Sequence, residues 1–259
     1  MVEAVTLYRA PTSVADADAV AEWLRERVDA DVRVRDRFVS VFGNEGDDAA
    51  ALAESFAEAR VLSPYERETG NTMVGIVRYE QRALDDPERG GGVIYDGLAV
   101  QAILNGLLPD DERGLDQLHV PLLDRVVGTW GDHDGRWHKR VNVLGQPGLV
   151  SVPGLYEAPA KPEQYYEAQQ KHALLSGGAP PREVLENEVD GEFLVESDPR
   201  TTDALKGYVL QCYHYLETGA DFCEAEDCRL HNPHRQPGVI RAQLREPEFC
   251  ARHAETYDA

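Results

Sequence analysis

Residues 212–230 read CYHYLETGADFCEAEDCRL and residues 250–253 read CARH, and together these two stretches contain all four cysteines of the chain. Cys223 and Cys228 are separated by four residues, Cys250 and His253 by two, and 21 residues lie between the two pairs. Two short-range pairs joined by a loop are a usual way for proteins to hold tetrahedral zinc. Because three thiolates and one imidazole fill all four positions, the spacing predicts one structural Zn²⁺ ion rather than a catalytic one.

Two other interpretations of this tail stay open. His231 or His234 could replace His253 as the fourth ligand, because both follow Cys228 at short spacing. Alternatively, the cysteines are free and buried, and the last histidine is a surface residue. The clustering favours the metal, since a reducing cytoplasm disfavours structural disulfides.

The residues before the tail have the pattern of a long amphipathic helix. Apolar side chains recur at spacings of three and four and define an inward face: Leu205, Tyr208, Val209, Cys212 and Leu216. Ser197 or Asp198 is a suitable N-cap, Pro199 suits the first turn, and Gly219 suits the end. The tail therefore follows directly on the last long helix.

Upstream, strand and helix patterns alternate. We expect strands over residues 2–8, 32–34 with 38–42 (a strand or hairpin), 72–83, 118–130 and 139–152. We expect helices capped by Thr12 or Ser13, starting at Asp47–Asp48, and over 94–107 and 163–175. This order predicts an α+β (α/β-like) fold, a mixed β-sheet with flanking helices. We expect one domain over 1–259, made of a sheet-and-helix part (1–175), a linker-like segment (176–196), the last helix (197–222) and the zinc tail (223–259).

The chain is strongly acidic, with 47 acidic and 26 basic residues, a net charge of -21 and only four lysines. Because the acidic residues are spread along the chain, we interpret them as adaptation to a salty cytoplasm, of the halophilic archaeal type, rather than as a patch for a basic partner. No basic stripe stands out, which argues against nucleic-acid binding. No apolar run approaches the roughly 20 residues of a membrane helix, and the start lacks a secretory pattern, so we expect a cytoplasmic protein.

The tail resembles that of the archaemetzincins, a metzincin-type family of zinc metallopeptidases. Their signature is HExxHxxGxxHCx4CxM, followed after about 17 residues by CxxC. Here Gly219, Cys223 and Cys228 fall in register, and the pair Cys250 and His253 takes the place of CxxC after 19 residues. The resemblance implies a metzincin-like fold with a zinc-bound tail, in which the last helix corresponds to the active-site helix of the family.

The catalytic half of the signature is replaced. The first histidine, the general-base glutamate, the second and third histidines and the methionine fall, in that order, on Cys212, Tyr213, Leu216, Phe222 and Leu230. His214 substitutes poorly, because on a helix its side chain is turned about 200° from that of position 212. With Glu217 it could form at most a small site on another face of the helix.

Two other regions contain candidate site residues. His133 and His138 have spacing that could hold a metal, although we favour a surface loop. By analogy with the metzincin cleft, Ser151, Tyr156 and Glu157 could line a groove, and an ordinary strand end followed by a proline-rich loop fits as well. Gly90–Gly92 is not followed by a phosphate-binding pattern and predicts a loop.

Three functions follow as hypotheses. The family resemblance alone implies a metallopeptidase, but the replaced residues favour a non-catalytic zinc-binding relative whose cleft binds a peptide or a protein. The second hypothesis is an active zinc hydrolase with a rearranged site drawn from Cys212, His214, Glu217 and either His172 or His138. The third is a zinc-stabilised interaction module unrelated to peptidases.

Overall fold

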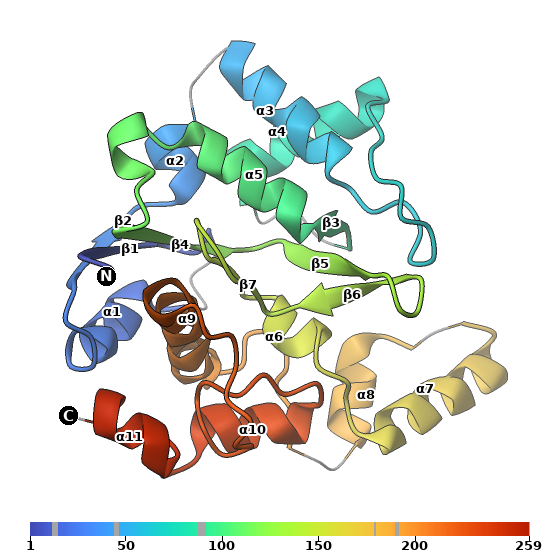
Figure 1. Cartoon of the computed structure of the whole chain (residues 1–259). Coiled ribbons are helices and arrows are strands. Elements are labelled where there is room, and N and C mark those ends of the chain that lie inside the picture. Colours follow the sequence, from blue (N-terminus) through green and yellow to red (C-terminus); the bar gives the residue numbers. More distant parts are fainter. Residues whose placement is uncertain (12–14, 44–46, 88–91, 179, 190–191, 259) are drawn as a thin grey trace.

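The computed structural model describes residues 1–11, 15–43, 47–87, 92–178, 180–189 and 192–258, and a five-stranded sheet lies at its centre (Figure 1). The strand order is β2-β1-β4-β8-β7. β1 (Ala4–Tyr8) pairs in parallel with β2 (Asp31–Arg35) and β4 (Gln117–Leu123). β4 pairs in parallel with β8 (Leu149–Ser151), which pairs antiparallel with β7 (Asn142–Val143). This arrangement confirms the predicted mixed sheet.

One face of the sheet is covered by α1 (Ala17–Arg25) and α9 (Thr201–Thr218), which lie side by side (Figure 1). Buried apolar side chains fill the space between these helices and the strands, among them Val5, Leu24, Leu118, Leu205 and Val209. α1 begins after Asp16, whose carboxylate accepts hydrogen bonds from the N–H groups of Asp18 (3.0 Å) and Ala19 (3.1 Å). Thr12 and Ser13, where we expected the cap, lie outside the described residues.

The opposite face carries α2 (Phe38–Phe42), α3 (Asp47–Glu58), α4 (Val74–Asp85) and α5 (Gly97–Leu107) (Figure 1). They enclose a second core with the sheet, which includes Tyr8, Phe56, Val100, Leu104 and Val127. A short 3₁₀ helix over Asp110–Glu112 leads from α5 to β4.

Two predicted strands are helices in the structure. Residues 38–42 form α2, because turning there buries Phe38 against the Tyr8 ring, with ring centroids 4.8 Å apart. Residues 74–85 form α4. The apolar residues Met73 and Val74, which suggested a buried strand, are exposed. The buried residues of α4 are Glu80 and Ala83, three positions apart, so packing at helical spacing overrides the strand-like local pattern.

A second sheet has the order β3-β5-β6. β3 (Ile94–Asp96) pairs in parallel with β5 (Val126–Gly131), which forms an antiparallel hairpin with β6 (Arg136–Arg140). The predicted helix over 94–107 therefore begins only at Gly97, where the Asp96 carboxylate caps α5. The polar loop expected over 131–137 is confirmed as the hairpin turn, although β5 and β6 each extend into it.

The last part of the chain lies beyond α9, on the side away from the sheet (Figure 1). It contains α10 (Gln236–Leu244) and α11 (Ala251–Tyr257), and beside it lie α6 (Gly154–Glu157), α7 (Glu163–Ser176) and α8 (Arg182–Glu188). The predicted helix over 163–175 is confirmed, whereas the linker-like segment contains α8. Among the described helices, none combines the length and apolar character needed to cross a membrane.

Candidate metal centre

The first cysteine pair lies in a tight loop that follows α9. Gly219 ends the helix with a left-handed backbone (φ 72°), which glycine adopts without steric cost. The N–H of Cys223 then donates to the carbonyl of Leu230 (2.9 Å), and the N–H of Cys228 donates to the carbonyl of Ala225 (3.1 Å). These bonds close the loop and turn both thiols to the same side.

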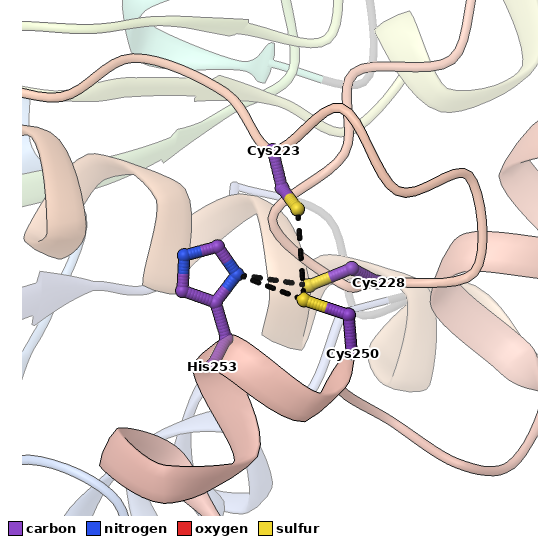
Figure 2. Close-up of side chains that lie close together, drawn as sticks. All are labelled: Cys223, Cys228, Cys250 and His253. Carbon is purple, nitrogen blue, oxygen red and sulfur yellow. Dashed lines mark hydrogen bonds between the residues drawn. The ribbon is translucent and has the colours of Figure 1, made fainter.

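The second pair lies at the start of α11. Cys250 is the N-cap residue, and the N–H of His253 donates to its carbonyl (2.9 Å). Residues three apart at a helix start share one side, so thiol and imidazole face the loop together. Figure 2 shows the side chains of Cys223, Cys228, Cys250 and His253 converging, with the three sulfur atoms and one ring nitrogen close together.

The four ligand atoms have the separations of a tetrahedral zinc site. All lie within 4.8 Å of one another. The Sγ atoms of Cys223 and Cys250 are 3.8 Å apart, and the Nδ1 of His253 is 3.5 Å from the Sγ of Cys228 and 3.4 Å from that of Cys250. Zinc–sulfur bonds of about 2.3 Å and zinc–nitrogen bonds of about 2.0–2.1 Å at tetrahedral angles place such atoms about 3.8 Å and about 3.5 Å apart. The residues present therefore fit the metal.

Burial affects the protonation of the thiols and of the imidazole in this cluster. Burial raises the pKa of Cys228 to about 12 and raises that of Cys223 as well. Burial opposes ionisation of Cys250 too, but hydrogen bonds, among them one from the backbone of His253, bring its pKa below the ordinary value. Burial lowers the pKa of His253, so its imidazole is neutral and available as a ligand. A divalent ion would supply the charge that three thiolates need.

Neighbouring polar groups hold the two halves of the cluster together. The carboxylate of Glu248, two residues before Cys250, pairs with Arg229 (2.6 Å), which follows Cys228. The same carboxylate pairs with Arg27, which follows α1 (2.8 Å). Gln211 of α9 donates from Nε2 to the carbonyl of Arg229 (2.8 Å), so the loop is also tied to the helix. The metal centre is thereby connected to the main core by hydrogen bonds and ion pairs.

The alternative ligands His231 and His234 are not part of the cluster among the described residues. The Nδ1 of His231 lies 2.8 Å from the carbonyl oxygen of Cys223 and donates to it, which supports the loop from outside the metal position. His234 lies farther along the chain, on the wall of a groove.

The positions that match the catalytic half of the signature do not converge. Cys212 is fully buried and faces Gly148, and burial raises its pKa to about 12. Phe222 lines the same groove as His234. Glu217 instead accepts a hydrogen bond from the backbone N–H of Val2 (2.5 Å). Within the described part of the chain, Cys212 has no His, Asp or Glu beside it in a potential metal group.

His214 contacts residues of the C-terminal tail. Its Nδ1 lies 2.8 Å from the hydroxyl of Tyr257, and its ring packs edge-on against that of His253, with centroids 5.3 Å apart. Burial lowers the pKa of His214. His214 and Glu217 therefore do not form the small joint site that the helix geometry allowed. The role of His214 was missed because the sequence does not reveal which helix face the tail covers.

Two more candidate regions have different outcomes. His133 and His138 lie with Asp134 at the β5–β6 turn, close enough to hold a metal ion, and His138 is 3.0 Å from the Asp134 carboxylate. His172 pairs with Glu188 and is in neither of the potential metal groups of the described residues. Ser151 is fully buried, and its hydroxyl donates to the carbonyl of Arg125 (2.7 Å).

Tyr156 and Glu157 do line a hollow, of about 1030 Å³, between α6, α8 and the end of β4. Glu157 pairs there with Lys139 (2.6 Å) and with Arg182 (3.2 Å). Of Gly90–Gly92, only Gly92 is among the described residues.

The mixed sheet and the Cys₃His cluster define an α+β protein with a site suited to one tetrahedral metal ion. The chain belongs to the family of unknown function DUF7001, whose model matches residues 6–256. The crystal structure of archaemetzincin from Methanopyrus kandleri is similar at a TM-score of 0.44 and 12% identity, covering 98% of this chain and 92% of that one. No curated protein matches the chain.

Proposed function

We propose that the protein is a zinc-binding relative of the archaemetzincins that has lost peptidase activity and uses a groove beside its metal tail to bind a peptide or a protein. The observation that carries this proposal is the contrast between the two halves of the signature. Cys223, Cys228, Cys250 and His253 have zinc-site separations, whereas Cys212 is buried against Gly148 and lacks neighbouring ligands among the described residues.

The metal would have a structural role in this protein. Bound by four protein side chains, zinc leaves no position for water or substrate. Other residues hold the ligands in position. Gln211 and Glu248 position the loop and the start of α11. His214, which is bonded to Tyr257, packs against the ring of His253. Thiolate ligands of this kind are maintained in a reducing compartment, which is why we also propose a cytoplasmic location.

Hydrolysis of a peptide library tests the catalytic part of the proposal. The purified protein, assayed in high salt with and without a chelator, is expected to give no cleavage above background. Chelator-sensitive cleavage that disappears in Cys212→Ala or His214→Ala would show that a rearranged active site exists.

One observation favours a second function, a metal-dependent hydrolase centred on the β5–β6 turn. His133, Asp134 and His138 offer three ligand atoms, and both histidines line the groove. Against it, the Asp134 carboxylate is also held by Arg136 (2.7 Å) and His133 is 80% exposed. This alternative requires a second bound metal ion and activity that is lost in His138→Ala.

A further inference from the structure

A groove of about 800 Å³ separates the β5–β6 hairpin from the tail. One wall is formed by β6, and Arg136, His138 and Arg140 occupy alternate positions of this strand, so their side chains share a face. The other wall includes Phe222 and His234 of the tail. The charged and titratable side chains on its walls are thus mainly those of arginine, lysine and histidine, with the carboxylate of Glu157 also among them, in a protein whose net charge is -21.

Most cations around the groove are neutralised by acids. Arg136 pairs with Asp134 at 2.7 Å, and Lys139 pairs with Glu157 at 2.6 Å. Arg140 differs, because it forms no ion pair with any described residue. Among the described residues, its only side-chain hydrogen bond runs from Nε to the hydroxyl of Thr129 (2.8 Å). Arg25 and Arg37 also form no ion pair with a described residue, but their guanidinium groups donate to the backbone carbonyls of Val32 (2.9 Å) and Leu84 (3.0 Å). Among the described contacts, the guanidinium of Arg140 has no such backbone acceptor.

The guanidinium of Arg140 is oriented by Thr129, and its terminal nitrogens have no partner among the described residues. Thr129 occupies Nε, so among described contacts Nη1 and Nη2 keep all of their donor capacity. The side chain is half-buried, and this burial lowers the pKa of Arg140 below the ordinary value. Placing an unpaired cation there costs folding free energy, which an anion bound in the groove would offset.

We propose that Arg140 is the anchor of an oxyanion-binding site, which receives a carboxylate or phosphate group of the ligand in this groove. Both groups accept two parallel hydrogen bonds from a guanidinium. This inference rests on the proposed function, since it takes the groove as the binding surface and specifies the chemistry of what binds. His138 and His234 line the same groove and would add further hydrogen-bond donors.

Side chains, rather than strand addition, would recognise the ligand. On the edge of β6 that does not pair with β5, the backbone N–H of Trp137 already donates to the carbonyl of Pro64 (2.9 Å). Just beyond β6, the carbonyl of Val141 accepts from the N–H of Ser151 (2.7 Å). An extended peptide therefore cannot add along the whole strand, which places the recognition on groups such as Arg140.

The test is a binding titration of the zinc-loaded full chain with two probes, inorganic phosphate and a tetraglutamate peptide that is acetylated at its N-terminus and amidated at its C-terminus. Tetraglutamine capped in the same way is the neutral counterpart. It is run at constant salt, because the net negative charge repels anions unless salt screens it. We expect one of the anionic probes to bind with 1:1 stoichiometry and the neutral peptide not to bind. Arg140→Gln is expected to weaken this binding at least tenfold, and Arg140→Lys by less, because it keeps the charge and loses the paired donors.

Arg113→Gln is the matched control, because Arg113 pairs with Asp110 and lies outside the groove. It is expected to bind like the wild type. The melting temperature of Arg140→Gln should equal or exceed that of the wild type, and a clear fall would mark a structural cation and contradict the proposal. Absence of binding by both anions, or binding that survives Arg140→Gln, would overturn it. Zinc content and the lack of peptidase activity are measured separately, so the proposed function can hold even if this site fails.

Discussion

At the scale of single residues, Cys250 connects the two halves of the metal cluster, with its Sγ 3.8 Å from that of Cys223 and 3.4 Å from the Nδ1 of His253. Serine keeps the size of this side chain but is a much poorer zinc ligand. We therefore expect Cys250→Ser to lose zinc and to lower the free energy of unfolding by about 3 kcal/mol or more, since structural zinc contributes directly to folding. Zinc content and urea denaturation measure the two effects.

Cys212→Ala is the control for that substitution. Cys212 is buried but lies outside the metal cluster, so the loss should be about 1 kcal/mol of packing, with zinc retained. Equal loss of zinc from both variants would refute the ligand assignment.

His119 predicts a pH dependence of stability. It is buried, its Nδ1 lies 2.7 Å from the Tyr8 hydroxyl, and its Nε2 lies 2.9 Å from the carbonyl oxygen of Glu112. Burial lowers its pKa from 6.5, so on acidification the unfolded chain takes up the proton first. The free energy of unfolding should thus fall as the pH drops below about 6.5.

Denaturation at a series of pH values measures this slope, and His119→Gln should flatten it. Part of the slope should remain, because burial lowers the pKa of His214 in the same direction. An unchanged slope in His119→Gln would exclude His119 as a source.

The convergence of the Cys₃His cluster could be predicted from the sequence, because the residue types and their spacing are those of a metal site. The environment of Arg140 could not be predicted, since it depends on which side chains lie around it in space. Likewise, the burial of Cys212 follows from its inward place on the helix, but its contact with Gly148 depends on how β8 meets α9.

At the scale of elements, α9 and α10 pack closely at Gly207. A Cβ at this position would lie 1.8 Å from the Oε1 of Gln243 and 3.1 Å from the carbonyl oxygen of Arg229. We expect Gly207→Ala to destabilise the protein by about 1–3 kcal/mol, because the buried Gln243 side chain would have to move and give up its hydrogen bond to the carbonyl of Arg229 (3.1 Å). Urea denaturation measures the change.

Gly106 on α5 is the matched control for this prediction. A Cβ there would meet nothing within 4 Å, so Gly106→Ala should stabilise the protein by about 0.5–1 kcal/mol through helix propensity. If both substitutions changed the free energy of unfolding in the same direction, close packing at Gly207 would not explain the effect of Gly207→Ala.

The order of elements was largely predictable, and the errors have one physical origin. Val74, Ile76 and Val77 favour a strand locally, yet α4 forms because the buried Glu80 must reach Arg60 (3.2 Å) and Arg125 (2.7 Å). These partners are 20 and 45 residues away along the chain, beyond the reach of a local pattern.

At the scale of the whole molecule, the net charge of -21 predicts a strong dependence on salt. Repulsion between acidic residues destabilises the folded state, and salt near 1 M screens it by shortening the Debye length to about 3 Å. We expect the melting temperature to rise on the order of 10 °C between 0.1 M and 2 M KCl. A melting temperature that stays flat or falls over this range would contradict adaptation to a salty cytoplasm.

The measurement that tests the central claim most directly is the metal content of the purified protein, by elemental analysis after exhaustive dialysis. One zinc per chain, retained in Cys212→Ala and absent in Cys250→Ser, is the predicted result. Protein that is folded and free of metal, or zinc that remains in Cys250→Ser, would contradict the assignment of a structural zinc site to the tail.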